Sequence, residues 1–105
     1  MDEKRLEEAM QLIFIAGNAK TQAMKAILKA EEGDAVEAEA MLQQAKKELH
    51  GAHAIQTNWL TSEMNDTEVE KSILLIHSQD HFMAATTTID MAERFCVLYK
   101  KLEVN

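Results

Sequence analysis

The chain has 105 residues, which suits a single domain spanning residues 1–105, and a hydrophobic content of 47% excludes intrinsic disorder. A formal net charge of −7 without clustered basic residues excludes nucleic acid as a partner, and no apolar run approaches the ~18 residues of a membrane span. With no proline and only three glycines, the chain has too few turn-forming residues for a β-sandwich, so we predict an all-α fold.

The first predicted helix runs from about Glu3 to Glu32. One apolar row at helical spacing is expected to face the core, and it consists of Leu6, Met10, Ile13, Gly17, Met24 and Ile27. Gly33 then ends the helix, because glycine readily adopts the left-handed conformation that follows a helix C-terminus. Asp34 is expected to cap the next helix, and Glu37 three residues later completes a pattern like a capping box.

The second predicted helix runs from about Ala35 to Met64. Its apolar row is Ala38, Leu42, Ala45, Leu49, Ala52, Gln56 and Trp59. Gln56 is the polar member of this row, so we expect it to form a hydrogen bond inside the bundle. The segment Asn65-Asp66-Thr67 breaks the pattern, and Thr67 with Glu70 repeats the capping spacing.

The third predicted helix runs from that break to about Leu102 and carries two apolar rows. The main row is Ile73, Ile76, Asp80, Met83, Thr87, Met91, Phe95, Leu98 and Leu102. The second row is Leu75, Phe82, Ile89 and Cys96. A helix that is apolar on two sides usually has neighbours on two sides.

Three helices of about 45 Å each, joined by short loops, predict an elongated up-down-up antiparallel three-helix bundle. The apolar surface is too broad for one bundle, since residues 12–16 cover more than one face of the first helix. We therefore infer a homo-oligomer. The N-terminus does not resemble a signal peptide, and Cys96, the only cysteine, is expected to pack rather than react and fits a reducing cytosol.

The segment from His77 to His81 holds the residues that could carry chemistry. His77 and His81 are four residues apart and project from adjacent turns of one helix face. Asp80 lies one turn from His77 and falls on the main apolar row, where a carboxylate is costly unless something compensates its charge. Three interpretations of this cluster remain open on spacing alone.

Catalytic zinc is the first interpretation, and it lacks a general base, because Ser78 stands where a His-Glu-x-x-His protease has its glutamate. The second is a pair of ordinary surface histidines, which leaves Asp80 unexplained. The third is a phosphorylatable histidine, whose neutral ring attacks a phosphoryl group through a nitrogen lone pair and later passes the group on. A hydrogen bond from Gln79, His81 or a backbone carbonyl would orient the other ring nitrogen.

Several segments carry a family resemblance. Residues 74–83, Leu-Leu-Ile-His-Ser-Gln-Asp-His-Phe-Met, resemble the His-x-Gln-Asp-His-Leu-Met segment of the lactose/cellobiose-type enzyme IIA of the bacterial phosphotransferase system. Residues 16–20, the turn at Gly33-Asp34 and residues 52–57, Ala-His-Ala-Ile-Gln-Thr, are similar to further segments of that family. The resemblance extends over essentially the whole chain, with Phe82 in place of the family's leucine.

The resemblance implies a cytoplasmic homotrimer of three-helix bundles, which is a nine-helix bundle. It implies that His77 takes a phosphoryl group from the histidine-containing phosphocarrier protein and passes it to a cysteine of the sugar-specific IIB component. The sugar would be a β-linked disaccharide of the cellobiose, lactose or chitobiose type. Asp80 matches the family's metal-binding aspartate, which implies one Mg²⁺ ion on the trimer axis.

Other residues receive supporting roles. Gln79 and His81 are expected to orient the ring of His77 or the phosphoryl oxygens. His53 belongs to a segment that resembles the family, and we expect it to support the structure or to lie near an active site across a subunit boundary. The alternative function is a noncatalytic helical scaffold or regulator, which would take up no phosphate.

Overall fold

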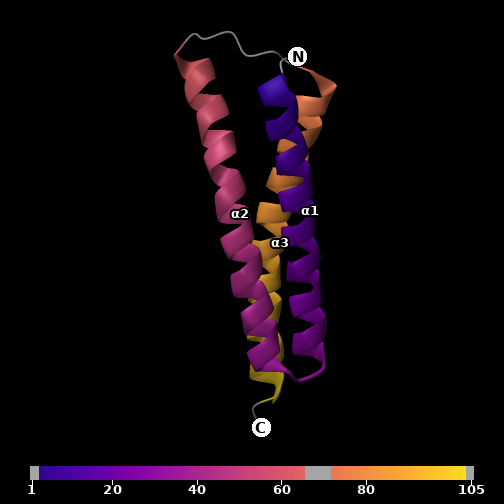
Figure 1. The fold of residues 1–105 in the computed structure, drawn as a ribbon. Helices are drawn as coiled ribbons and strands as arrows, with labels where there is room; N and C mark the ends of the chain where they lie inside the picture. Colours follow the sequence, from indigo (N-terminus) through magenta and orange to yellow (C-terminus); the bar gives the residue numbers. More distant parts are fainter. Residues whose placement is uncertain (1–2, 66–71, 104–105) are drawn as a thin grey trace.

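The computed structural model describes residues 3–65 and 72–103, and the regular elements in these ranges are three helices. Helix α1 spans Glu3–Glu31, α2 spans Ala35–Met64 and α3 spans Ile73–Glu103. They run antiparallel to one another in chain order, and in Figure 1 α1 runs down, α2 up and α3 down along an elongated bundle with extents of 57 × 21 × 19 Å. The predicted all-α class and antiparallel order are confirmed. None of the helices in the described part of the chain has the length and apolar character needed to cross a membrane.

The turn between α1 and α2 follows the prediction. Gly33 has a φ of 85°, and the N–H groups of Gly33 and Asp34 donate to the carbonyls of Ala30 and Lys29 at 3.1 and 2.9 Å, which is a Schellman arrangement. The Asp34 carboxylate then accepts a hydrogen bond from the Glu37 N–H at 3.1 Å. Local backbone chemistry therefore ends one helix and begins the next within three residues.

We expect Asp34→Ala to lower the free energy of unfolding by about 1 kcal/mol, because the substitution leaves an N-terminal N–H of α2 without its acceptor. Urea denaturation followed by circular dichroism measures the change. Asp34→Asn is the matched control, since it keeps an acceptor oxygen at the same position. Identical unfolding midpoints for Asp34→Ala and the unsubstituted chain would contradict the role of this cap.

The start of α3 differs in detail from the expectation. The Ser72 hydroxyl accepts a hydrogen bond from the Leu75 N–H at 3.2 Å, and the Ser72 carbonyl accepts from the Ile76 N–H at 3.1 Å. Ser72 is therefore the N-terminal cap of α3 in the described part of the chain. The capping pair predicted at Thr67 and Glu70 lies outside the described residues.

The core face of α2 is the one that the sequence predicts. Its buried residues are Ala38, Leu42, Ala45, Leu49, Ala52 and Trp59, and Gln56 in the same row is half-buried. This helix has one dominant apolar row, so its periodicity leaves a single choice of buried face.

The predicted core row of α1 is wrong. The buried residues are Ala9, Leu12, Ala16, Ala19, Ala23, Ala26 and Ala30. In the predicted row, Leu6, Met10 and Met24 are exposed, and Gly17 and the two isoleucines are half-buried. Small side chains let helix backbones approach closely, so the alanine face packs against α2 and α3. The larger apolar side chains of α1 remain on the outside.

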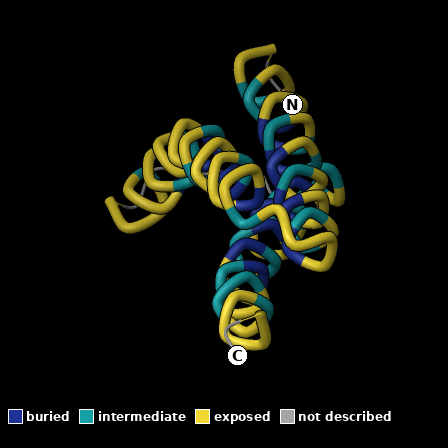
Figure 2. Tube along the Cα trace, turned by 90° about the horizontal axis from the view of Figure 1, so that it is seen from below, coloured by how far each residue is buried: buried dark blue, intermediate teal, exposed yellow. Residues whose placement is uncertain are grey.

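The two apolar rows of α3 lie on different sides of the bundle. The second row lies in the core, with Leu75, Phe82 and Ile89 buried and Cys96 half-buried. The main row faces outward, and its large apolar members range from 40% exposed at Phe95 to 86% at Ile73. Figure 2 shows buried segments gathered toward the middle of the bundle and exposed ones on its outer sides. Asp80 is therefore exposed in the single chain, and its charge carries no burial cost there.

Candidate functional site

His77 and His81 form a direct pair on the second and third turns of α3. Their Nε2 atoms lie 3.0 Å apart, and the rings meet edge to face with centroids 4.4 Å apart. At this distance one Nε2 donates a proton and the other accepts it. His77 is exposed and His81 is half-buried. The pair thus presents an accessible imidazole whose ring is held by its neighbour, as the four-residue spacing predicts.

Asp80 lies on the adjoining face of α3, one turn from Ile76 and Met83 in the exposed apolar row. A carboxylate offers the hard oxygen ligands that Mg²⁺ prefers. Among the residues described for one chain, however, no group of three histidine, cysteine, aspartate or glutamate side chains is placed to hold a metal ion. A metal bound at Asp80 would take its other ligands from water or from other copies of the chain.

Gln79 points to a different part of the molecule from His77. Its Oε1 accepts a hydrogen bond from Gln56 Nε2 at 3.1 Å, which ties α3 to α2, and the same Nε2 lies 3.7 Å from the sulfur of Met83. The hydrogen bond predicted for Gln56 inside the bundle is confirmed. Its partner was not predicted, although a lone amide in the apolar row of α2 signalled that some partner exists.

His50 and His53 lie on α2, whereas the pair of His77 and His81 lies on α3. Both line a groove between α2 and α3, and the exposed ring of His53 stands 5.9 Å from that of the buried Phe82. A salt bridge between Lys46 and Glu93, at 3.1 Å, crosses the same groove. Within one chain, His53 therefore supports the packing of α2 on α3.

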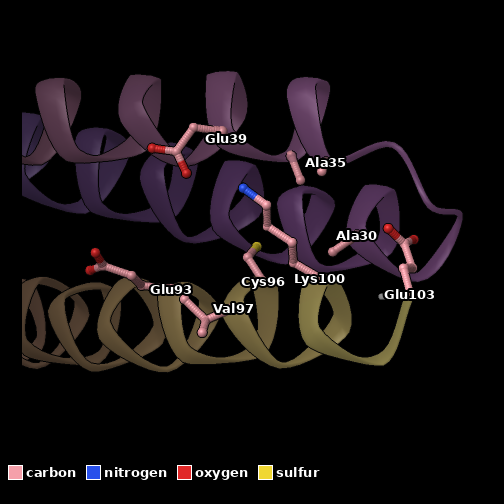
Figure 3. Close-up of a pocket in the computed structure, with 9 residues that line it drawn as sticks. Ala30, Ala35, Glu39, Glu93, Cys96, Val97, Lys100 and Glu103 are labelled. Carbon is pink, nitrogen blue, oxygen red and sulfur yellow. The ribbon is translucent and has the colours of Figure 1, made fainter. Parts of the chain in front are cut away.

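Cys96 is placed for packing rather than for nucleophilic attack. It lines a cavity near the C-terminal end of α3 (Figure 3), and its thiol donates to the Ala26 carbonyl of α1 at 3.9 Å. Burial raises the pKa of the Cys96 thiol, and the nearby carboxylates of Glu39 and Glu93 raise it further. A thiol that stays protonated is a poor nucleophile, which agrees with the packing role expected from the sequence.

Comparisons with known proteins agree on one family. Residues 7–100 match the family described as "PTS system, Lactose/Cellobiose specific IIA subunit". The lichenan-specific phosphotransferase enzyme IIA component of Bacillus subtilis is 40% identical over 97% of this chain and 93% of that protein.

Two solved structures are also similar. The cellobiose-specific enzyme IIA from Bacillus anthracis is 40% identical, has a TM-score of 0.94 and covers 100% of this chain and 96% of its own. The IIA component in the IIA(Chitobiose)–HPr complex of the N,N'-diacetylchitobiose branch of the Escherichia coli phosphotransferase system is 29% identical, with a TM-score of 0.84. It covers 98% of this chain and 100% of its own.

Proposed function

Because this chain belongs to the lactose/cellobiose-specific IIA subunit family of the phosphotransferase system, whose members are phosphotransferases, we propose that His77 is its phosphoryl carrier. The observation that carries this proposal is the pair of imidazoles, in which an exposed His77 has its Nε2 held 3.0 Å from that of His81. An accessible nucleophile oriented by a second side chain is the arrangement that covalent catalysis requires.

The attacking atom in this proposal is Nε2 of His77. On a helix, Nε2 is the ring nitrogen farther from the backbone, so it has more room for a tetrahedral phosphoryl group than Nδ1. Its lone pair attacks the phosphorus while the bond to the donor's nitrogen breaks, and that electron pair returns to the donor's ring. His77 then carries its proton on Nδ1, and the Nε2–H of His81 donates to a phosphoryl oxygen.

The onward step reverses the same chemistry. A thiolate of the IIB component attacks the phosphorus, the bond to His77 breaks, and the electron pair returns to Nε2. The phosphoryl donor in this proposal is HPr, the histidine-containing phosphocarrier protein, which the Escherichia coli relative binds in its solved complex. The names of the relatives support a role in the uptake of cellobiose- or chitobiose-type sugars. We propose that the protein acts in the cytoplasm, which the family role supports.

A homotrimer accounts for the outward face of α3. Its exposed apolar row would be buried if three copies of α3 met on a common axis, as in a coiled coil. Three Asp80 carboxylates would then converge, and three chains together would supply oxygen ligands that the described residues of one chain do not gather in a single place. A Mg²⁺ ion held there would neutralise their mutual repulsion.

The experiment that tests the function is phosphate uptake by the isolated protein. Incubation with phosphoenolpyruvate and the general phosphotransfer proteins should add one acid-labile phosphate per chain, which intact mass spectrometry detects. If the wild-type chain gains no phosphate, the alternative of a noncatalytic helical scaffold is favoured.

A further inference from the structure

The turn of α3 that carries His77 packs on the core through the buried Leu75 and Phe82, with Ser78 between them. Ser78 is a small side chain that is fully buried and donates its hydroxyl hydrogen back to the Leu75 carbonyl at 2.7 Å, so it adds no large apolar contact of its own. This turn also lies close to the start of the described helix at Ile73, where helices open most readily. A polar contact to a neighbouring helix would therefore add to the packing that fixes its orientation.

The hydrogen bond between Gln56 and Gln79 is suited to that task. It joins α2 to α3 at 3.1 Å, and both amides are half-buried, so water competes with it only in part. At about 100° per residue, Gln79 projects about 200° away from each of His77 and His81. A Gln79 side chain held toward α2 therefore turns both histidines to the opposite side of α3, where a docking protein can reach them.

We propose that Gln56 is a positioning residue for phosphoryl transfer. Its amide donates to Gln79, sets the rotation of the α3 turn, and so keeps the His77–His81 pair facing outward with its 3.0 Å contact intact. Gln56 does not touch the reacting atoms and acts only through Gln79. This inference rests on the proposed function of His77.

The test measures the initial rate of phosphoryl transfer from phosphorylated HPr over a range of HPr concentrations. Gln56→Leu removes the donor while keeping a helix-forming side chain of similar size. We expect the rate at saturating HPr to fall about fivefold to tenfold, the cost of losing one ordinary hydrogen bond, with KM changed by less than about twofold. Gln56→Lys, which keeps an N–H donor, should recover at least half of the rate.

The matched control is Gln43→Leu, which removes an amide from the same helix whose hydrogen bond, to Glu39 at 2.8 Å, stays within α2. Its rate should equal that of the wild type. Side-chain ¹⁵N chemical shifts of His77 and His81 should change in Gln56→Leu and not in Gln43→Leu. A general loss of stability would not produce such a change confined to the two histidine rings.

Two outcomes would overturn this inference and leave the proposed function of His77 intact. One is a Gln56→Leu rate within twofold of the wild type at saturating HPr, and the other is a Gln56→Lys variant as slow as Gln56→Leu. A wild-type chain that takes up no phosphate would instead remove the proposed function and this inference with it.

Discussion

His77→Ala is expected to abolish phosphate uptake from HPr, because Nε2 of His77 is the attacking atom in the proposed function. His81→Ala should slow uptake about 10–100-fold and leave it detectable. The His81 variant loses one hydrogen bond to a charged phosphoryl group, which contributes roughly 1.5–3 kcal/mol. Quench-flow sampling followed by intact mass spectrometry measures both rates under the same conditions.

The control for this experiment is another histidine of the chain. His50→Ala changes an exposed side chain that lines the groove between α2 and α3, and it should take up phosphate at the wild-type rate. A phosphate that still accumulates on His77→Ala would transfer the carrier role to another residue. If His81→Ala also abolished uptake, His81 would be required for the transfer rather than supporting it.

The turn and the α2 face could be predicted because their causes are local. A glycine with positive φ followed by an aspartate cap needs only neighbouring backbone groups, so the bounds of α2 were right at both ends. Likewise, the single apolar row of α2 admits one buried face. The spacing of His77 and His81 predicted their contact for the same reason, since it depends only on helix geometry.

The buried faces of α1 and α3 could not be chosen from periodicity. Both helices are apolar on two sides. In α1 the rule that large apolar residues face the core selects the wrong row, and in α3 both rows hold large apolar residues, so the rule selects neither. Close approach of the helices decides instead, and it places alanines of α1 and Ser78 of α3 inside the bundle. The rotation of α3 about its axis depends on contacts with another helix. Periodicity along α3 therefore could not predict the hydrogen bond between Gln56 and Gln79 or the exposure of Asp80.

The outer apolar row of α3 is exposed in the single chain, so a charge introduced there should have a large effect on assembly. Leu98 is 50% exposed in the single chain and lies in the row that we propose to be the trimer interface. Leu98→Glu would place three unpaired carboxylates in that interface, away from Asp80. We expect it to convert the assembly to monomers in size-exclusion chromatography with light scattering, because burying a carboxylate without a partner costs several kcal/mol.

Val36→Glu is the matched control, since Val36 is 83% exposed and lies on the first turn of α2, outside this row. An acidic residue there also suits the positive end of a helix, so the variant should assemble like the wild type. A Leu98→Glu protein that remains a trimer would contradict the placement of α3 at the axis.

Asp80→Leu should behave in the opposite way to Leu98→Glu although both change the same row. Three Asp80 carboxylates at the proposed axis would repel each other, so the wild-type assembly should weaken when a chelator removes divalent cations. Leucine replaces that repulsion with apolar packing, and exchanging buried charges for apolar residues is often neutral or stabilising. The variant should therefore stay trimeric with or without chelator. A monomeric Asp80→Leu protein would place the carboxylate away from the axis, whereas a wild-type assembly indifferent to chelator would mean that the three charges are neutralised without a metal.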